Sequence, residues 1–267
     1  MLMMTNVDTL LLTKLSGLES VAIYNVALPV VQIFQVSMVI LLVFAPIATD
    51  LWQRGRREDL AAACRFVVDA LTLIGGTVVI ILITASGTVI GILFGGGFEE
   101  AAAPLALLGA GMPMLAIAQF YLYILPAIGR PTEIGAVSVA STLLNIALNA
   151  ILIPLWSVKG AALATAIAYA AMMLMSHQTV STHVGLRISH RGWRRTVLQS
   201  AGFGILGYVL SPYAPGVPRT LLVSGGLVAL FVLVNRQRIV SLWLEGRTML
   251  AGRSQVRSAG VAPGGNT

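Results

Sequence analysis

Long apolar runs separated by short polar stretches dominate this chain. A further stretch, residues 1–15, is also largely apolar but carries Asp8 and Lys14, so we interpret it as an incomplete helix. Crossing a hydrocarbon core about 30 Å thick takes about 20 apolar helical residues. The pattern therefore predicts an all-α, polytopic membrane helix bundle. The seven full runs cover residues 21–49, 65–94, 102–127, 133–155, 159–179, 197–211 and 218–235, of which the sixth is short and rich in glycine.

The composition supports a membrane protein. Hydrophobic residues make up 57% of the 267 residues and charged residues only 10%, whereas a soluble domain carries about 25% charge. The single cysteine, Cys64, excludes an internal disulfide and a multi-cysteine metal site. The first residues lack the basic start and cleavage site of a signal peptide.

The basic residues alternate between the loops. Fourteen of the 17 Lys and Arg lie after the first full run, at Arg130, in residues 187–195 and in the tail; the other loops hold Lys14, Lys159 and Arg219. By the positive-inside rule this predicts a plasma-membrane protein with a cytoplasmic C-terminus. The net charge of +7 is then an orientation signal, and we expect no nucleic acid as a partner.

The same alternation places Glu19 outside. The opening helix would then run outward with its inner end missing or very short, which suggests a fragment of something larger. At the other end, Trp243 and its neighbours fit a segment lying on the membrane surface. The composition of residues 252–267 is typical of a disordered end.

Polar side chains inside apolar runs are the candidate functional residues, because such groups face a partner helix or a wet cavity. Asn145 and Asn149 stand four residues apart, hence on one helical face; they either bond to neighbouring helices or line a cavity. Polar faces on three helices suggest an enclosed aqueous path. The candidate cavity-lining or coupling residues are Asp8, Lys14, Asn25, Gln32, Gln119, Asn145 and Asn149.

Asp8 is the sharpest of these candidates. It lies eleven residues from Glu19, which at about 1.5 Å per residue is roughly 16 Å into the bilayer. An ionisable group at that depth suggests a function, although an ion pair with Lys14 or a helix-start position would also explain it. Asp69 is less telling, since an i, i+4 pair with Arg65 accounts for it.

Motifs for enzyme chemistry are missing from the sequence. The glycine-rich stretch FGGGFEEA is followed by no Lys-Ser or Lys-Thr, so it is not a phosphate loop. The three histidines do not have the spacing of a zinc site. We therefore expect no catalytic residues, no metal and no cofactor.

Residues 129–169 resemble polysaccharide-export flippases, the O-antigen-type translocases of lipid-linked oligosaccharides in the multidrug/oligosaccharidyl-lipid/polysaccharide exporter superfamily. The stretch LWSVKGAA departs from that family, which more often has a glycine directly after the proline–aromatic pair. Upstream, VDTLLLTKLSGLESVAIYNVA is similar to the family's entry into its second lobe, and ILFGGGFEEAAAPLALL also fits. The matching residues are Gly129, Pro131, Asn145, Asn149, 152–154, 160–162, Ala164 and Thr165, then Asp8, Tyr24, Asn25, Ala27 and 93–95.

This resemblance implies two six-helix lobes facing each other across a cavity, often followed by two extra helices. On that basis residues 1–180 are the second lobe with an incomplete first helix. Residues 181–196 are a cytoplasmic basic loop, 197–235 are two additional transmembrane helices, and 236–267 are a cytoplasmic tail that is partly disordered. A separately encoded first-lobe protein, self-pairing or a truncated gene product would then explain the absent lobe.

The expected function is transport across the lipid bilayer. The resemblance implies a flippase for polyprenyl-diphosphate-linked oligosaccharide in polysaccharide biosynthesis, with most substrate-binding arginines in the absent lobe. Asp8 would bind a coupling cation or pair with such an arginine. The alternatives are a cation-coupled multidrug or metabolite exporter of the same superfamily, and a truncated fragment that does not transport.

Overall fold

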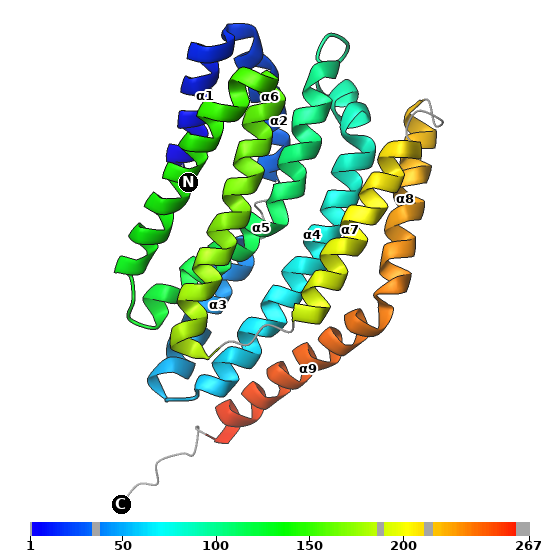
Figure 1. Cartoon of the computed structure of the whole chain (residues 1–267). Helices are drawn as coiled ribbons and strands as arrows, with labels where there is room; N and C mark the ends of the chain where they lie inside the picture. The colour runs from blue at the N-terminus through cyan, green and yellow to red at the C-terminus, as the bar shows by residue number, and fades with distance from the viewer. Residues whose placement is uncertain (1, 34–37, 186–189, 211–215, 260–267) are drawn as a thin grey trace, which may run out of the picture.

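A computed structural model describes residues 2–33, 38–185, 190–210 and 216–259. Over these ranges the chain is helical and contains no strand, which confirms the predicted all-α bundle (Figure 1). The elements are α1 (Leu2–Ser16), α2 (Leu18–Ile33), α3 (Met38–Gln53), α4 (Arg57–Phe94), η2 (Glu99–Ala101), α5 (Ala102–Ala127), α6 (Thr132–Val184), α7 (His190–Leu210), α8 (Val217–Val234) and α9 (Arg236–Ala259).

The apolar runs account for these helices. In the described part of the chain, four helices are long and apolar enough to cross a membrane: Arg57–Phe94, Glu99–Ala127, Thr132–Val184 and Val217–Val234. Residues 18–32 form a shorter apolar helix. The run at 21–49 is divided between α2 and α3, and residues 34–37 between them lie outside the described residues.

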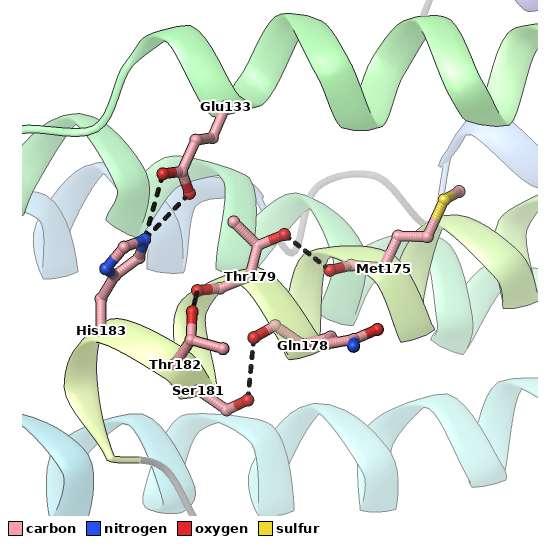
Figure 2. A network of polar contacts seen from close by, with 7 residues as sticks. All are labelled: Glu133, Met175, Gln178, Thr179, Ser181, Thr182 and His183. Atoms are coloured by element: carbon pink, nitrogen blue, oxygen red, sulfur yellow. Dashed lines mark hydrogen bonds and ion pairs between the residues drawn. The ribbon is translucent and has the colours of Figure 1, made fainter.

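Helix α6 is a hairpin of two antiparallel arms. The backbone leaves the helical region at Ser157, with φ 48° and ψ −124°. A straight helix of 53 residues would be about 80 Å long, yet Nε2 of His183 lies 3.0 Å from Oε1 of Glu133. Figure 2 shows this contact between the two ends of the hairpin. The predicted separate segments 133–155 and 159–179 are therefore its two arms.

The turn of this hairpin lies in LWSVKGAA, the stretch where the sequence departs from the flippase family that it resembles. Ser157 follows Trp156 and is the residue with positive φ, a conformation that glycine adopts more easily than serine. Gly160 lies just beyond the turn, where a Cβ would come within 2.0 Å of the carbonyl oxygen of Leu152. The two arms therefore approach as closely as their backbones allow.

The connections between helices gather at two ends of the bundle (Figure 1). The α1–α2 turn, the α6 turn and η2 lie at one end. The α3–α4 and α5–α6 connections and α9 lie at the other end, and these segments carry most of the arginines. The charge alternation thus matches the arrangement of the helices, while the cytoplasmic orientation of the basic end stays a prediction.

Close packing of α7 against α4 explains the glycines in the predicted run at residues 197–211. A Cβ on Gly204 would lie 2.9 Å from the side chain of Ile83, and one on Gly207 would lie 2.0 Å from Oγ1 of Thr84. Small residues let helices pack closely in membranes, where packing rather than apolar burial holds them together. These glycines therefore seat α7 directly on α4.

Helical structure extends into regions that the sequence suggested were irregular. Helix α6 continues to Val184 and α7 begins at His190, so much of the expected basic loop 181–196 is helical; residues 186–189 lie outside the described residues. Helix α9 continues to Ala259, into the stretch interpreted as disordered, and residues 260–267 are again outside the description. Asp69 accepts a hydrogen bond from Arg238 of α9 instead of the expected pairing with Arg65.

Candidate functional site

A buried polar cluster joins α1, α2 and both arms of α6. Each of its five side chains is at most 1% exposed. We call this group the Asp8 cluster. Its members are Asp8, Tyr24, Asn145, Asn149 and Thr165.

Two neighbouring turns bring these residues together. The α1–α2 turn packs beside the α6 turn, where Oγ of Ser20 lies 3.1 Å from Oγ of Ser157. Every member of the Asp8 cluster except Asn145 stands seven to nine residues from one of these turns, which is a depth of about 12 Å along a helix. Residues at equal depth on adjacent helices meet, so the two hairpins converge on one point.

The carboxylate of Asp8 accepts three hydrogen bonds from this cluster. Asn149 donates from Nδ2 to Oδ1 at 2.6 Å. The hydroxyl of Thr165 donates to Oδ2 at 2.8 Å, and that of Tyr24 donates to the same oxygen at 3.0 Å. All three donors are neutral, and each comes from a different helix or helix arm.

The two asparagines share the face that the sequence predicts. Nδ2 of Asn149 also donates to Oδ1 of Asn145 at 3.1 Å, and Nδ2 of Asn145 donates to the hydroxyl of Thr165 at 3.4 Å. The polar run on one arm of α6 thus reaches across to the other arm. Hydrogen bonding between helical segments therefore accounts for the two asparagines. This is one of the two interpretations from the sequence, the other being that they line a cavity.

Asp8 has no cationic partner among the described residues. Lys14 is exposed, so the ion pair considered from the sequence is not formed. Burying a carboxylate without a countercharge is unfavourable, and hydrogen bonds from neutral donors offset only part of the penalty. A proton or a bound cation would remove the remainder.

The amide of Asn149 carries one further buried oxygen. Oδ1 of Asn149 is buried and has no hydrogen-bond partner among the described residues. Nδ2 of the same amide donates to Asp8 at 2.6 Å, so this oxygen points away from the carboxylate. The described residues contain no group of three or more His, Cys, Asp or Glu that could hold a metal ion.

The other sequence candidates lie away from this cluster. Gln119 is buried on α5, with 8% of its surface exposed. Asn25 and Gln32 are exposed on α2, and Lys14 is exposed on α1. The seven candidates therefore separate into a buried group around Asp8, one buried residue on α5, and three residues on the surface of the described helices.

Two members of the cluster were not among the sequence candidates for the site. Tyr24 and Thr165 appear in the sequence analysis only as positions that match the flippase family. The usable signal was symmetry about the α6 turn, since Asn149 and Thr165 each lie eight residues from Ser157. Recognising that turn from the sequence would have paired them.

Comparison with known proteins supports a membrane transporter fold. No protein-family model matches the chain. An uncharacterized membrane protein of Methanocaldococcus jannaschii, MJ1068, is 30% identical over 173 residues, which covers 62% of this chain and 33% of that protein. The solved structure of the lipid II flippase MurJ, in an inward closed conformation, superposes with a TM-score of 0.67 at 16% identity, over 88% of this chain and 51% of MurJ.

The chain therefore has the fold of a MurJ-like helical membrane bundle, and it spans about half the length of MurJ and a third of MJ1068. MurJ is named as a lipid II flippase, and its likeness to this chain is one of fold. Similarity to the polysaccharide-export branch is carried by the sequence motifs alone.

Proposed function

We propose that this chain forms one lobe of a flippase that moves polyprenyl-diphosphate-linked oligosaccharide between the leaflets of a membrane. The shared fold with a lipid II flippase supports a lipid-linked substrate. The single observation that carries the proposal is the Asp8 carboxylate, buried where two helix hairpins meet and held only by neutral donors. A merely structural membrane bundle has no need of such a group.

The Asp8 cluster would couple an ion to movement of the lobe. Charged Asp8 attracts a cation or a proton, and its occupation changes how strongly the donors of α2 and α6 are held to α1. A ligand that binds one arrangement of helices better than another shifts the population toward it. Alternating access by rocking lobes needs only such a bias.

The diphosphate of the substrate requires cationic groups elsewhere. Lys14 is the basic residue of α1, and it is exposed two turns from Asp8. Because the chain matches 51% of MurJ, the working transporter would include a second lobe of similar size. That lobe, from a separate first-lobe protein, a second copy or the rest of a longer chain, would face Lys14, Asn25 and Gln32 and supply the remaining cations.

The proposal is tested by replacing Asp8 in a strain that depends on this gene for surface polysaccharide. Asp8→Asn keeps the shape and removes the charge, so we expect export to fall about 5- to 150-fold, the usual range of a coupling free energy. The matched control is Asp59→Asn, which removes an exposed carboxylate paired with Arg56 at the basic end and should leave export unchanged. Normal export by Asp8→Asn at normal protein level would refute the coupling role.

A cation-coupled exporter of drugs or metabolites is the second candidate. It is favoured by one observation: the Asp8 cluster, which is the buried polar centre of the described helices, contains no Lys, Arg or His that would bind a diphosphate. Proteoliposomes loaded separately with a fluorescent lipid-linked oligosaccharide and with a cationic dye would distinguish the two. Genes for glycosyltransferases beside this one would favour the flippase.

A non-transporting fragment is the third possibility raised by the sequence. Purification of the tagged chain from its own cells tests it directly. Co-purification of a polypeptide with a first-lobe pattern of six apolar helices supports a two-part transporter. A chain that purifies without any other lobe and fails to restore export in a deletion strain supports the fragment.

A further inference from the structure

Helix α9 presents an apolar stripe that no described part of the protein covers. Val240, Trp243 and Leu244 are 56%, 57% and 52% exposed. Arg236 and Arg247 lie at the two ends of this stripe on the same helical face, since residues spaced three or four apart share a face. We call these five residues the outer stripe.

The opposite face of α9 is firmly docked on the bundle. Ile239 and Leu242 pack against the apolar cluster formed by Leu73, Ile80, Leu227 and Phe231. A Cβ on Gly246 would lie 3.3 Å from the ring of Phe66, so the helix approaches α4 closely there. The outer stripe is thus held in a fixed direction, facing away from the bundle.

An ion pair fixes the rotation of α9. Arg238 donates to the carboxylate of Asp69 on α4 and to the hydroxyl of Thr196 on α7. The Asp69 and Arg238 side chains are 38% and 21% exposed, so this contact is partly shielded from solvent. It links three helices and prevents α9 from turning its apolar stripe inward.

Helix α9 starts directly at the end of a helix long and apolar enough to cross a membrane. Helix α9 begins at Arg236, one residue after Asn235, which caps the apolar helix α8. It runs across the end of the bundle that holds the basic connections (Figure 1). If α8 crosses a membrane, the outer stripe would lie where the hydrocarbon ends and the lipid headgroups begin.

The chemistry of this end suits an interface. The guanidinium of Arg247 lies 4.5 Å from the ring centroid of Trp243. That of Arg57, at the start of α4, lies 4.7 Å from the ring centroid of Trp52, near the end of α3. Trp is enriched at headgroup level because its ring is apolar and its N–H is polar. Two Arg–Trp stacks at one end, on segments far apart in the sequence, indicate a shared interfacial plane.

We propose that the outer stripe of α9 binds the surface of the bilayer through anionic phospholipid. Trp243, Val240 and Leu244 enter the boundary between headgroups and acyl chains, while Arg236 and Arg247 bind lipid phosphates. Charge selects this occupant: α9 carries five arginines and one glutamate in 24 residues. Anionic lipid headgroups attract clusters of arginine that lie next to a membrane-crossing helix.

The test measures which lipids contact Trp243 in the full chain. Replacing the other three tryptophans, Trp52, Trp156 and Trp193, by Phe leaves Trp243 as the only emitter. This protein is reconstituted into phosphatidylcholine vesicles containing increasing fractions of brominated phosphatidylglycerol, or of brominated phosphatidylcholine in a parallel series. We expect quenching by both bromolipids, with half-maximal quenching at a lower fraction of the anionic one.

Charge removal and a matched control complete the experiment. Arg236→Gln should raise the half-quenching fraction of brominated phosphatidylglycerol about fivefold, the effect of one basic residue near an anionic surface, and leave the phosphatidylcholine series unchanged. A second protein retaining only Trp156, which is 56% exposed but lies at the end with few basic residues, should be quenched equally by the two lipids. Equal quenching of Trp243 by both lipids would overturn the anionic preference, and no quenching would show that a protein partner or water covers the stripe.

Discussion

Replacing Gly160 by alanine tests whether the α6 hairpin is as tight as the structure has it. A Cβ at this position would lie 2.0 Å from the carbonyl oxygen of Leu152, 2.5 Å from its carbonyl carbon and 3.0 Å from the backbone nitrogen of Ile153. All three neighbours are backbone atoms, so no side-chain rotation relieves the clash. The arms would have to separate by roughly 1 Å, since overpacking that cannot relax shifts the backbone.

The sign of the effect makes this variant informative. Gly160 does not have a positive φ, so on helix propensity alone alanine would stabilise the protein by about 1 kcal/mol. The clash acts in the other direction and costs about 1–3 kcal/mol, the range for overpacked positions. We expect a net decrease in the free energy of unfolding. We also expect a weaker hydrogen bond from Thr165 to the carboxylate of Asp8.

Reversible unfolding in SDS mixed micelles, followed by far-ultraviolet circular dichroism, gives the required free energies. Gly135→Ala is the matched control, because Gly135 lies in the same helix and a Cβ there meets nothing within 4 Å. The control should be as stable as the parent protein or more so. Gly160→Ala with the stability of Gly135→Ala would refute the tight hairpin and, with it, the packing that forms the Asp8 cluster.

Five further variants, at four positions, test other contacts in the structure. Both Ser157→Gly and Ser157→Ala lose the hydroxyl contact with α2, but only glycine relieves the positive φ. Ser157→Gly should therefore raise the free energy of unfolding by up to about 1 kcal/mol, whereas Ser157→Ala should lower it. Asn149→Ala should cost about 1–3 kcal/mol by removing a 2.6 Å hydrogen bond to a buried carboxylate, and Asn145→Ala less, since its donated bond measures 3.4 Å; equal losses would contradict this ranking. Arg238→Gln should loosen α9 and speed tryptic cleavage within it several-fold, as loss of an ion pair worth about 1 kcal/mol predicts; unchanged cleavage would mean that apolar packing alone holds the helix.

The Asp8 cluster also suggests how one lobe could respond to an ion. Its donors come from α2 and from both arms of α6, while the acceptor lies on α1. A change in the charge of this one carboxylate would therefore alter hydrogen bonds from three helical segments at once. Close packing at the α6 turn would transmit that change as a movement of whole arms, because packed interfaces shift between discrete arrangements.

The sequence by itself determined the class of fold and the positions of the long apolar helices. Apolar runs as long as a bilayer is thick leave few alternatives to helices, because every backbone polar group in hydrocarbon must be paired within its own segment. It also indicated that Asp8, Asn145 and Asn149 mattered, since polar side chains in such runs need partners. It did not indicate that these three residues meet.

Only the tertiary structure decided that they do. Asp8 and Asn149 are separated by 141 residues, and their contact depends on two turns lying side by side, one of them at a serine in a conformation suited to glycine. Only the structure showed that α9 continues to Ala259, inside the polar stretch interpreted as disordered. Only the structure showed that Asp69 pairs with Arg238. The periodicity of a sequence indicates which face of a helix avoids lipid. Which helix then packs against that face depends on how closely the two helices can approach. Small residues such as Gly160 and Gly207 set that distance at specific points.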